Sequence, residues 1–174
     1  MAEGRAVSIA RSVTVSTIHR PARLTAVTVL GTDATGRPVA ERFLGLLAST
    51  AYRQSVLTIP TVGDLARAVL GLAADGAETH TGRSMRNVLE TLPRDLVFEQ
   101  DSSGLAQLVI DVVSMQERQI VRVFDVPEPV GTRSTVLVFL PKQRFDAQMP
   151  ERVAGSVAQQ YGSRATEVDS FLGS

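Results

Sequence analysis

The sequence contains no cysteine, no tryptophan and a single lysine, Lys142, among its 174 residues. The absence of cysteine excludes disulfide bonds, thiolate zinc ligands and cysteine nucleophiles. Histidine occurs only at His19 and His80, which argues against a histidine-rich metal site, although oxygen ligands for a hard cation remain available. We therefore expect no metal site in this chain.

Aromatic residues make up only 5% of the sequence, and 18 basic residues balance 18 acidic ones. A nucleic-acid surface requires a basic stripe and aromatic stacking platforms, so neither DNA nor RNA is an expected partner. No stretch approaches the roughly 18 apolar residues of a membrane helix. Residues 1–5 contain an acid and lack the apolar segment of a signal peptide. We expect a cytoplasmic protein without a membrane partner.

The first part of the chain shows the period-2 alternation of half-buried strands. Such strands are predicted at 6–18, 23–30 and 38–47, with turn residues at 31–36 between the last two. Together they would form a three-stranded antiparallel sheet, which is marginally stable by itself.

Helical periodicity follows. Thr61 precedes an amphipathic run over 62–73, with Asp64 at the capping-box position. A second short helix is predicted over 82–92, and Pro93 would end it. These two helices suggest a connector between modules.

From Asp95 onward the predicted order is β-α-β-β-α-β, the pattern of a ferredoxin-like sandwich. Its elements are a strand at Leu96–Phe98, a helix at 105–116, strands at 120–126 and 134–140, a helix from Pro150 to the Gly162 stop, and a strand at 165–172. The whole chain is thus predicted to be α+β.

Two motifs point to catalysis only superficially. Residues 31–37 resemble a phosphate-binding loop, but Arg37 replaces the lysine, Pro38 replaces the hydroxyl residue, and the segment joins two strands. A hairpin turn is the favoured interpretation. No G-x-S-x-G elbow occurs, and Ser156 lies in a different pattern, so no serine hydrolase is predicted.

The loop Asp101–Ser102–Ser103–Gly104 has two interpretations. Its side-chain oxygens can cap the helix that begins near Leu105. The same helix end can instead hold the carboxylate of a ligand.

Several strings resemble, in collinear order, the large NAD-specific glutamate dehydrogenases of bacteria, in the region that precedes their catalytic core. They lie at Ser16–Pro21, Arg42–Leu46 with Ser49–Tyr52, Leu89–Asp95 with Phe98, Gln116–Arg118 with Val121–Phe124, and Phe139–Phe145. The resemblance implies a closing hairpin of a PAS-like module at 1–50, a helical connector at 51–93 and an ACT-like βαββαβ domain at 94–174. The segment Phe124–Val130 departs from the family, which more often has a basic run there.

The resemblance implies a parent enzyme that uses NAD to deaminate L-glutamate oxidatively to 2-oxoglutarate. This chain has no G-x-G-x-x-G loop after a strand and no lysine-rich glutamate site. We therefore expect no cofactor and no catalytic residue here. The expected role is that of a regulatory and oligomerisation segment cut from a longer enzyme, with itself, the other parent domains and a free amino acid as partners.

The resemblance also suggests where an effector would bind. Amino-acid-binding ACT domains hold their ligand at the first strand-to-helix loop, which is similar to the loop at Asp101, Ser102, Ser103 and Gly104. Gly104 would admit the ligand backbone, and Asp101 would pair with its ammonium group. Two alternatives stay open: a structural spacer that bridges subunits without a ligand, and a small free-standing enzyme on a ferredoxin-like sheet.

Overall fold

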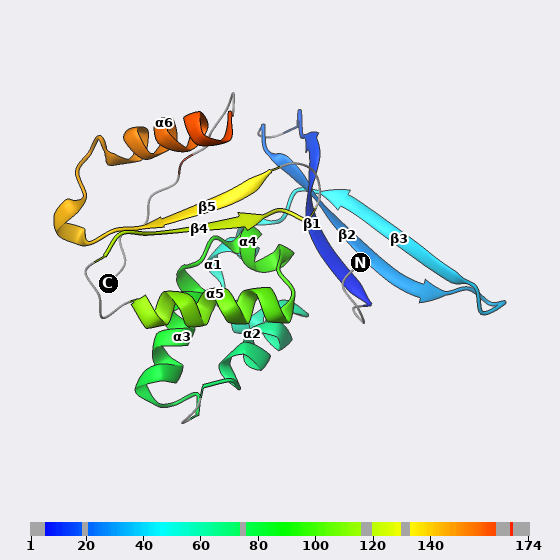
Figure 1. The fold of residues 1–174 in the computed structure, drawn as a ribbon. Helices are drawn as coiled ribbons and strands as arrows, with labels where there is room; N and C mark the ends of the chain where they lie inside the picture. Colours follow the sequence, from blue (N-terminus) through cyan, green and yellow to red (C-terminus); the bar gives the residue numbers. More distant parts are fainter. Residues whose placement is uncertain are drawn as a thin grey trace. The chain divides into compact units, whose positions relative to one another are not determined.

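The structure is a computed structural model, and it describes residues 6–18, 21–73, 76–115, 120–129, 133–162 and 168. Its elements, shown in Figure 1, are β1 (Val7–Val15), β2 (Arg23–Thr32), β3 (Pro38–Gly45), α1 (Ser49–Arg53), the 3₁₀ turn η1 (Val56–Thr58), α2 (Val62–Leu70), α3 (His80–Thr91), α4 (Arg94–Glu99), α5 (Ser102–Met115), β4 (Arg122–Pro127), β5 (Ser134–Phe139), the 3₁₀ turn η2 (Lys142–Arg144) and α6 (Met149–Tyr161). The predicted α+β class is confirmed. The chain divides into two compact units, residues 1–114 with 127–133, and residues 115–126 with 134–174.

The first unit begins with an antiparallel sheet in the order β1-β2-β3, as predicted. The alternation of side chains between the two faces of the sheet sets the strand register, in which Val27 of β2 pairs with Phe43 of β3. At the turn, Asp33 Oδ1 accepts hydrogen bonds from the backbone N–H of Thr35 (2.8 Å) and Arg37 (3.0 Å). Gly36 adopts φ 79°, which residues with a side chain rarely do. The segment 31–37 is therefore a hairpin turn.

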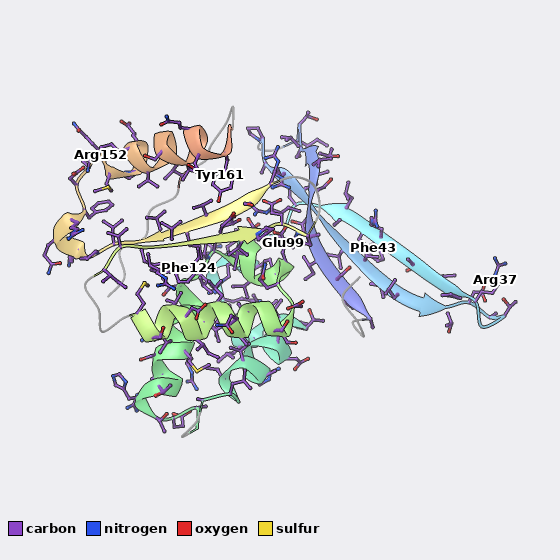
Figure 2. All side chains as sticks on the ribbon, in the orientation of Figure 1. Arg37, Phe43, Glu99, Phe124, Arg152 and Tyr161 are labelled. Atoms are coloured by element: carbon purple, nitrogen blue, oxygen red, sulfur yellow. The ribbon has the colours of Figure 1, made fainter. Side chains whose placement is uncertain are left out.

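Strand β3 is exposed along its whole length. Its apolar side chains Val39, Phe43 and Leu44 are 41%, 58% and 53% exposed, and Figure 2 labels Phe43 on the strand. Both faces of β3 thus present apolar surface.

The hydrophobic core lies in the helices that follow. Every buried apolar side chain in the described part of the chain belongs to residues 56–115. The most completely enclosed of them come from η1, α2, α3, α4 and α5: Val56, Val69, Met85, Leu89, Leu96, Val97, Leu105, Val109 and Val112. At Gly63 a Cβ atom would collide with the carbonyl group of Leu57, so η1 and α2 pack backbone to backbone.

The ends of α2 and α3 differ in how they are capped. The predicted helix α2 is present, but Thr61 makes no side-chain cap bond, and its φ of 64° is a positive value rare for threonine. Asp64 bonds to Arg67 instead of completing a capping box, so that prediction is wrong. Helix α3 starts two residues earlier than predicted, where Thr79 Oγ1 accepts from Gly82 N–H (3.2 Å).

The predicted strand Leu96–Phe98 is wrong, because these residues form helix α4. Pro93 stands at its N-cap and Asp95 lies in its first turn, where an acidic side chain favours a helix. Leu96, Val97 and Phe98 are all buried. A short run of apolar residues occurs in buried helices as well as in buried strands, so the run alone does not distinguish them. The first strand of the expected ferredoxin-like order is therefore missing, and the ACT-like fold is not confirmed.

The second unit contains β4, β5 and α6. Strands β4 and β5 pair in a two-stranded sheet, in which the rings of Phe124 and Phe139 meet edge to face at 5.7 Å. Helix α6 has Pro150 in its first turn and ends at Gly162 in the left-handed conformation (φ 59°), as predicted. The predicted last strand at 165–172 lies outside the described residues apart from Val168.

Candidate functional site

Of the segment singled out in the sequence, Asp101 lies between α4 and α5, whereas Ser102, Ser103 and Gly104 form the first turn of α5, which begins earlier than predicted. Asp101 Oδ1 accepts hydrogen bonds from the Gly104 N–H (2.8 Å) and the Ser103 hydroxyl (3.0 Å). This is the geometry of an N-cap, in which a carboxylate satisfies an amide left without an intrahelical partner. Asp101 therefore caps α5, as one of the two interpretations expected.

Gly104 leaves little room for a side chain. An added Cβ atom would lie 2.8 Å from Gln100 Oε1 and 3.3 Å from Asp101 Oδ1. The Gln100 side chain is flexible and can move aside, whereas Asp101 is held by its capping bonds. A larger residue at position 104 would thus disturb this loop first.

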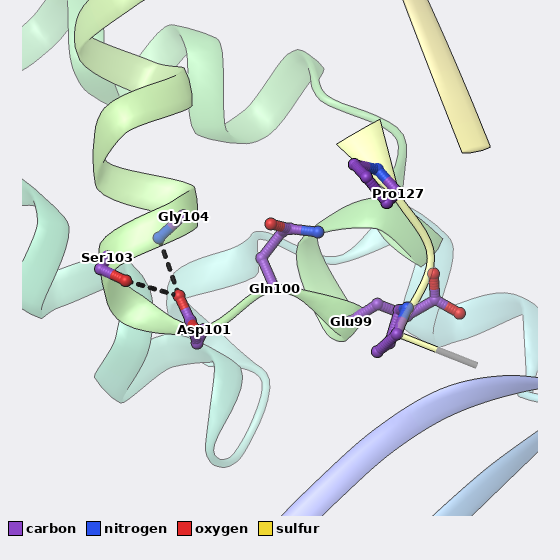
Figure 3. A pocket seen from close by; sticks show the side chains of 7 residues that line it. Glu99, Gln100, Asp101, Ser103, Gly104 and Pro127 are labelled. Atoms are coloured by element: carbon purple, nitrogen blue, oxygen red, sulfur yellow. Dashed lines mark hydrogen bonds between the residues drawn. The ribbon is translucent and has the colours of Figure 1, made fainter. Parts of the chain in front are cut away.

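The loop lines an open pocket of about 500 Å³, drawn in Figure 3. Its lining combines the end of α4, the start of α5 and two prolines from the β4–β5 turn: Glu99, Gln100, Asp101, Ser103, Gly104, Pro127 and Pro129. Three of the four predicted effector residues share this pocket. Ser102 instead lines a groove of about 370 Å³ beside β1 and α2.

A group of charged residues that the sequence analysis missed lies beside this pocket. Glu128, between Pro127 and Pro129, accepts hydrogen bonds from Arg11 Nη2 (2.8 Å), Arg23 Nη1 (2.9 Å) and Arg23 Nη2 (2.8 Å). Its side chain is only 5% exposed. These bonds join the turn to β1 and β2 within the first unit.

Glu99 extends this group from α4. It accepts from the backbone N–H of Arg11 and from Arg11 Nε (3.3 Å), and its side chain is 4% exposed. Burial, which disfavours the charged form, raises the pKa of the Glu99 carboxyl above its ordinary value. Hydrogen bonds to Glu128 raise the pKa of the Arg23 guanidinium, so that group stays charged. We call Arg11, Arg23, Glu99 and Glu128 the charge cluster.

A second polar arrangement ties η1 to α3. The Glu90 carboxylate accepts from the Ser55 hydroxyl, the Val56 N–H (3.3 Å) and Arg94 Nη2 (2.8 Å). Burial opposes the charge of Glu90, but these hydrogen bonds prevail and lower its pKa. These hydrogen bonds link η1, α3 and the start of α4.

The remaining residues considered in the sequence are two histidines and Ser156. His80 is exposed at the start of α3, and His19 lies outside the described residues. Among the described residues no three histidine, aspartate or glutamate side chains gather as metal ligands. Within that same part of the chain, no helix is long and apolar enough to cross a membrane. Ser156 lies inside α6 and bonds to the Arg152 carbonyl (2.9 Å).

Comparison with known proteins gives the family. Residues 59–118 match the family "Glutamate dehydrogenase, helical motif 1", which spans α2 to α5. Proteins named NAD-specific glutamate dehydrogenase from Halomonas elongata and Pseudomonas aeruginosa are 28% and 32% identical to this chain over 95% and 82% of its length. The chain matches one segment of the large NAD-specific glutamate dehydrogenases. The resemblance seen in the sequence is thus confirmed.

The chain corresponds to only a small part of each relative. It spans about a tenth of the length of these relatives, with 10% of the Halomonas protein and 9% of the Pseudomonas protein covered. A relative of the same name from Mycobacterium tuberculosis is 24% identical over 76% of the chain, or 8% of its own length. The glutamate dehydrogenase helical motif coincides with the part of the chain that holds the buried core.

Proposed function

We propose that this chain is a non-catalytic segment that regulates and assembles a large NAD-specific glutamate dehydrogenase. The whole enzyme would oxidise L-glutamate to 2-oxoglutarate with NAD. In this proposal the segment supplies a packed helical core and surfaces for other domains, and the reaction takes place elsewhere. Its partners would be the remaining domains of the enzyme, another copy of itself and a free amino acid.

The alignment is the observation that carries this proposal. It covers 95% of this chain but only 10% of the Halomonas protein. The glycine-rich loop that binds a dinucleotide is not present in the sequence. The lysine-rich glutamate site is missing as well, since Lys142 is the only lysine. A non-catalytic role is therefore the simplest one consistent with both facts.

The catalytic part of the proposal is tested by enzymology. The purified chain, incubated with glutamate and NAD, should produce no NADH absorbance, while the full-length Pseudomonas aeruginosa enzyme assayed in parallel serves as the positive control. Sustained glutamate-dependent NADH formation by the chain after removal of contaminants would refute the proposal.

The regulatory part extends the ACT-like prediction. The hairpin of β4 and β5 followed by α6 supplies the β-β-α part of the expected order, whereas α4 stands where the first strand was expected. We propose that these three elements belong to an ACT-like regulatory module. Calorimetric titration of the chain with the common amino acids tests it: saturable heat supports regulation, and its absence favours the structural spacer.

A second candidate function is effector binding at the predicted loop. The pocket lined by Asp101, Ser103 and Gly104 favours it, because a free amino acid would fit a cavity of that size. The capping bonds of Asp101 count against it, since they engage the carboxylate that would pair with an ammonium group. An Asp101→Ala variant separates capping from effector binding.

A further inference from the structure

The two arginines of the charge cluster are held in place by groups other than Glu128. Arg23 Nε donates to the Ser12 carbonyl (3.0 Å), and Arg11 Nε donates to Glu99 (3.3 Å). Both guanidinium groups are mostly enclosed, since the side chains of Arg11 and Arg23 are 21% and 14% exposed. Each guanidinium group is thus also held by a contact that does not involve Glu128.

The carboxylate at that place is bound as a ligand would be. Arg23 forms two parallel bonds to Glu128, Nη1 to Oε1 (2.9 Å) and Nη2 to Oε2 (2.8 Å), which is the bidentate fork of arginine–carboxylate recognition. Arg11 Nη2 adds a third bond to Oε1 (2.8 Å). Enclosed cations of this kind require an anion, because an unpaired buried charge is strongly unfavourable.

From this geometry we infer that Arg11 and Arg23 form a carboxylate-binding site, and that Glu128 is its tethered occupant. The site recognises a carboxylate by its charge and planar shape, so a small free carboxylate can take the place of the Glu128 side chain. The open pocket lined by Glu99, Pro127 and Pro129 borders the turn that carries Glu128. This inference rests on contacts within the chain and not on the proposed role in glutamate dehydrogenase.

Tethering explains why Glu128 occupies the site in the intact chain. A ligand carried on the same polypeptide has an effective concentration in the millimolar range or above. A free carboxylate binds two arginines only weakly, so it competes poorly while Glu128 is present. Removing the Glu128 charge should therefore expose the site.

The test uses Glu128→Gln in the full 174-residue chain, with sodium acetate as the probe and sodium chloride at equal ionic strength as the salt control. We expect the variant to lose roughly 5–10 °C in Tm, because the enclosed Arg23 loses its carboxylate partner and Arg11 keeps only its contacts with Glu99 and Asp95. Acetate should restore a substantial part of that loss saturably, with half of the effect in the millimolar range. The wild-type chain should gain no more Tm from acetate than from chloride.

Glu41→Gln is the matched control, since Glu41 is an exposed residue on β3 of the same sheet. It should change Tm by no more than about 1 °C and show no acetate effect. A loss of Tm in Glu128→Gln that acetate restores no better than chloride would overturn the inference, as would equal acetate effects in both variants.

A second readout keeps the inference testable if Glu128→Gln melts too low for this comparison. Phenylglyoxal modifies accessible guanidinium groups, and peptide mass spectrometry locates them. Arg11 and Arg23 should react faster in the variant than in the wild-type chain, and acetate should slow them selectively. Equal reaction rates in the variant and the wild type, or protection by chloride as good as by acetate, would refute the carboxylate site.

Discussion

At the scale of single residues, Asp101 decides between capping and effector binding. Its carboxylate accepts the Gly104 N–H and the Ser103 hydroxyl in the structure without a ligand. The sequence predicted both roles because the same helix end serves both. The distances in the structure show the capping bonds, and effector binding stays a prediction.

Asp101→Ala should lower the free energy of unfolding by about 1 kcal/mol, because α5 loses its cap. Urea unfolding measures the loss, and Asp111→Ala, near the other end of the same helix, is the control. If the loop also binds an amino acid, the variant should lose a calorimetric affinity that the wild type shows. Loss of that affinity without a change in stability would contradict capping.

Glu99 and Glu90 should give opposite dependences of stability on pH. The pKa of Glu99 is raised in the folded chain, so the folded state binds its proton more tightly. Its contribution to stability is greatest below the ordinary value of 4.5 and falls as pH rises through the folded pKa. The pKa of Glu90 is lowered, so its contribution is present above 4.5 and is lost as pH falls through the folded pKa.

The measurement is urea unfolding of Glu99→Gln and Glu90→Gln between about pH 3 and about pH 7. Relative to the wild type, Glu99→Gln should become progressively more stable as pH rises, and Glu90→Gln progressively less stable. Parallel curves for the two variants would show that one of the two carboxyl environments is wrongly described.

At the scale of elements, the helical core depends on the face that α5 buries. Leu105 is fully enclosed, whereas Ile110 on the same helix is 43% exposed. Leu105→Ala should cost about 2–5 kcal/mol of unfolding free energy, because it removes a buried side chain and leaves a cavity. Ile110→Ala should cost less than about 1 kcal/mol in the same urea experiment. Similar losses would place the core elsewhere.

Some helices and strands were predicted correctly from the sequence, and one helix was missed. The three N-terminal strands and helix α6 were predicted because alternation, turn residues and the Gly162 stop are local signals. Helix α4 was missed because Leu96, Val97 and Phe98 form an apolar run too short to reveal its period, although Pro93 and Asp95 marked a helix start.

The charge cluster could not be predicted in the same way. Arg11 meets Glu99 and Glu128 across 88 and 117 positions of sequence, and such pairings depend on tertiary structure. The only local sign was the pair of prolines around Glu128, in the segment where the sequence departs from its family.

At the scale of the whole molecule, we expect β3 to be a surface for self-association. Its backbone groups on the outer edge have no neighbouring strand in the sheet order, and Phe43 is 58% exposed. Phe43→Ser should lower the weight-average mass seen by sedimentation velocity at high concentration. Leu72→Ser, at a residue 59% exposed outside the sheet, should leave it unchanged. A wild-type chain that stays monomeric throughout would contradict this prediction.

The buried apolar side chains of the described residues all lie within 56–115, so the helices of that segment should unfold locally less often than the sheet. Backbone amides exchange with deuterium when their hydrogen bonds break, and bonds beneath packed side chains open least often. The amides of α2, α3 and α5 should therefore exchange slowest, whereas those of β2 and β3 should exchange early. We therefore expect the sheet to change conformation against a neighbouring protein surface while the helices stay folded.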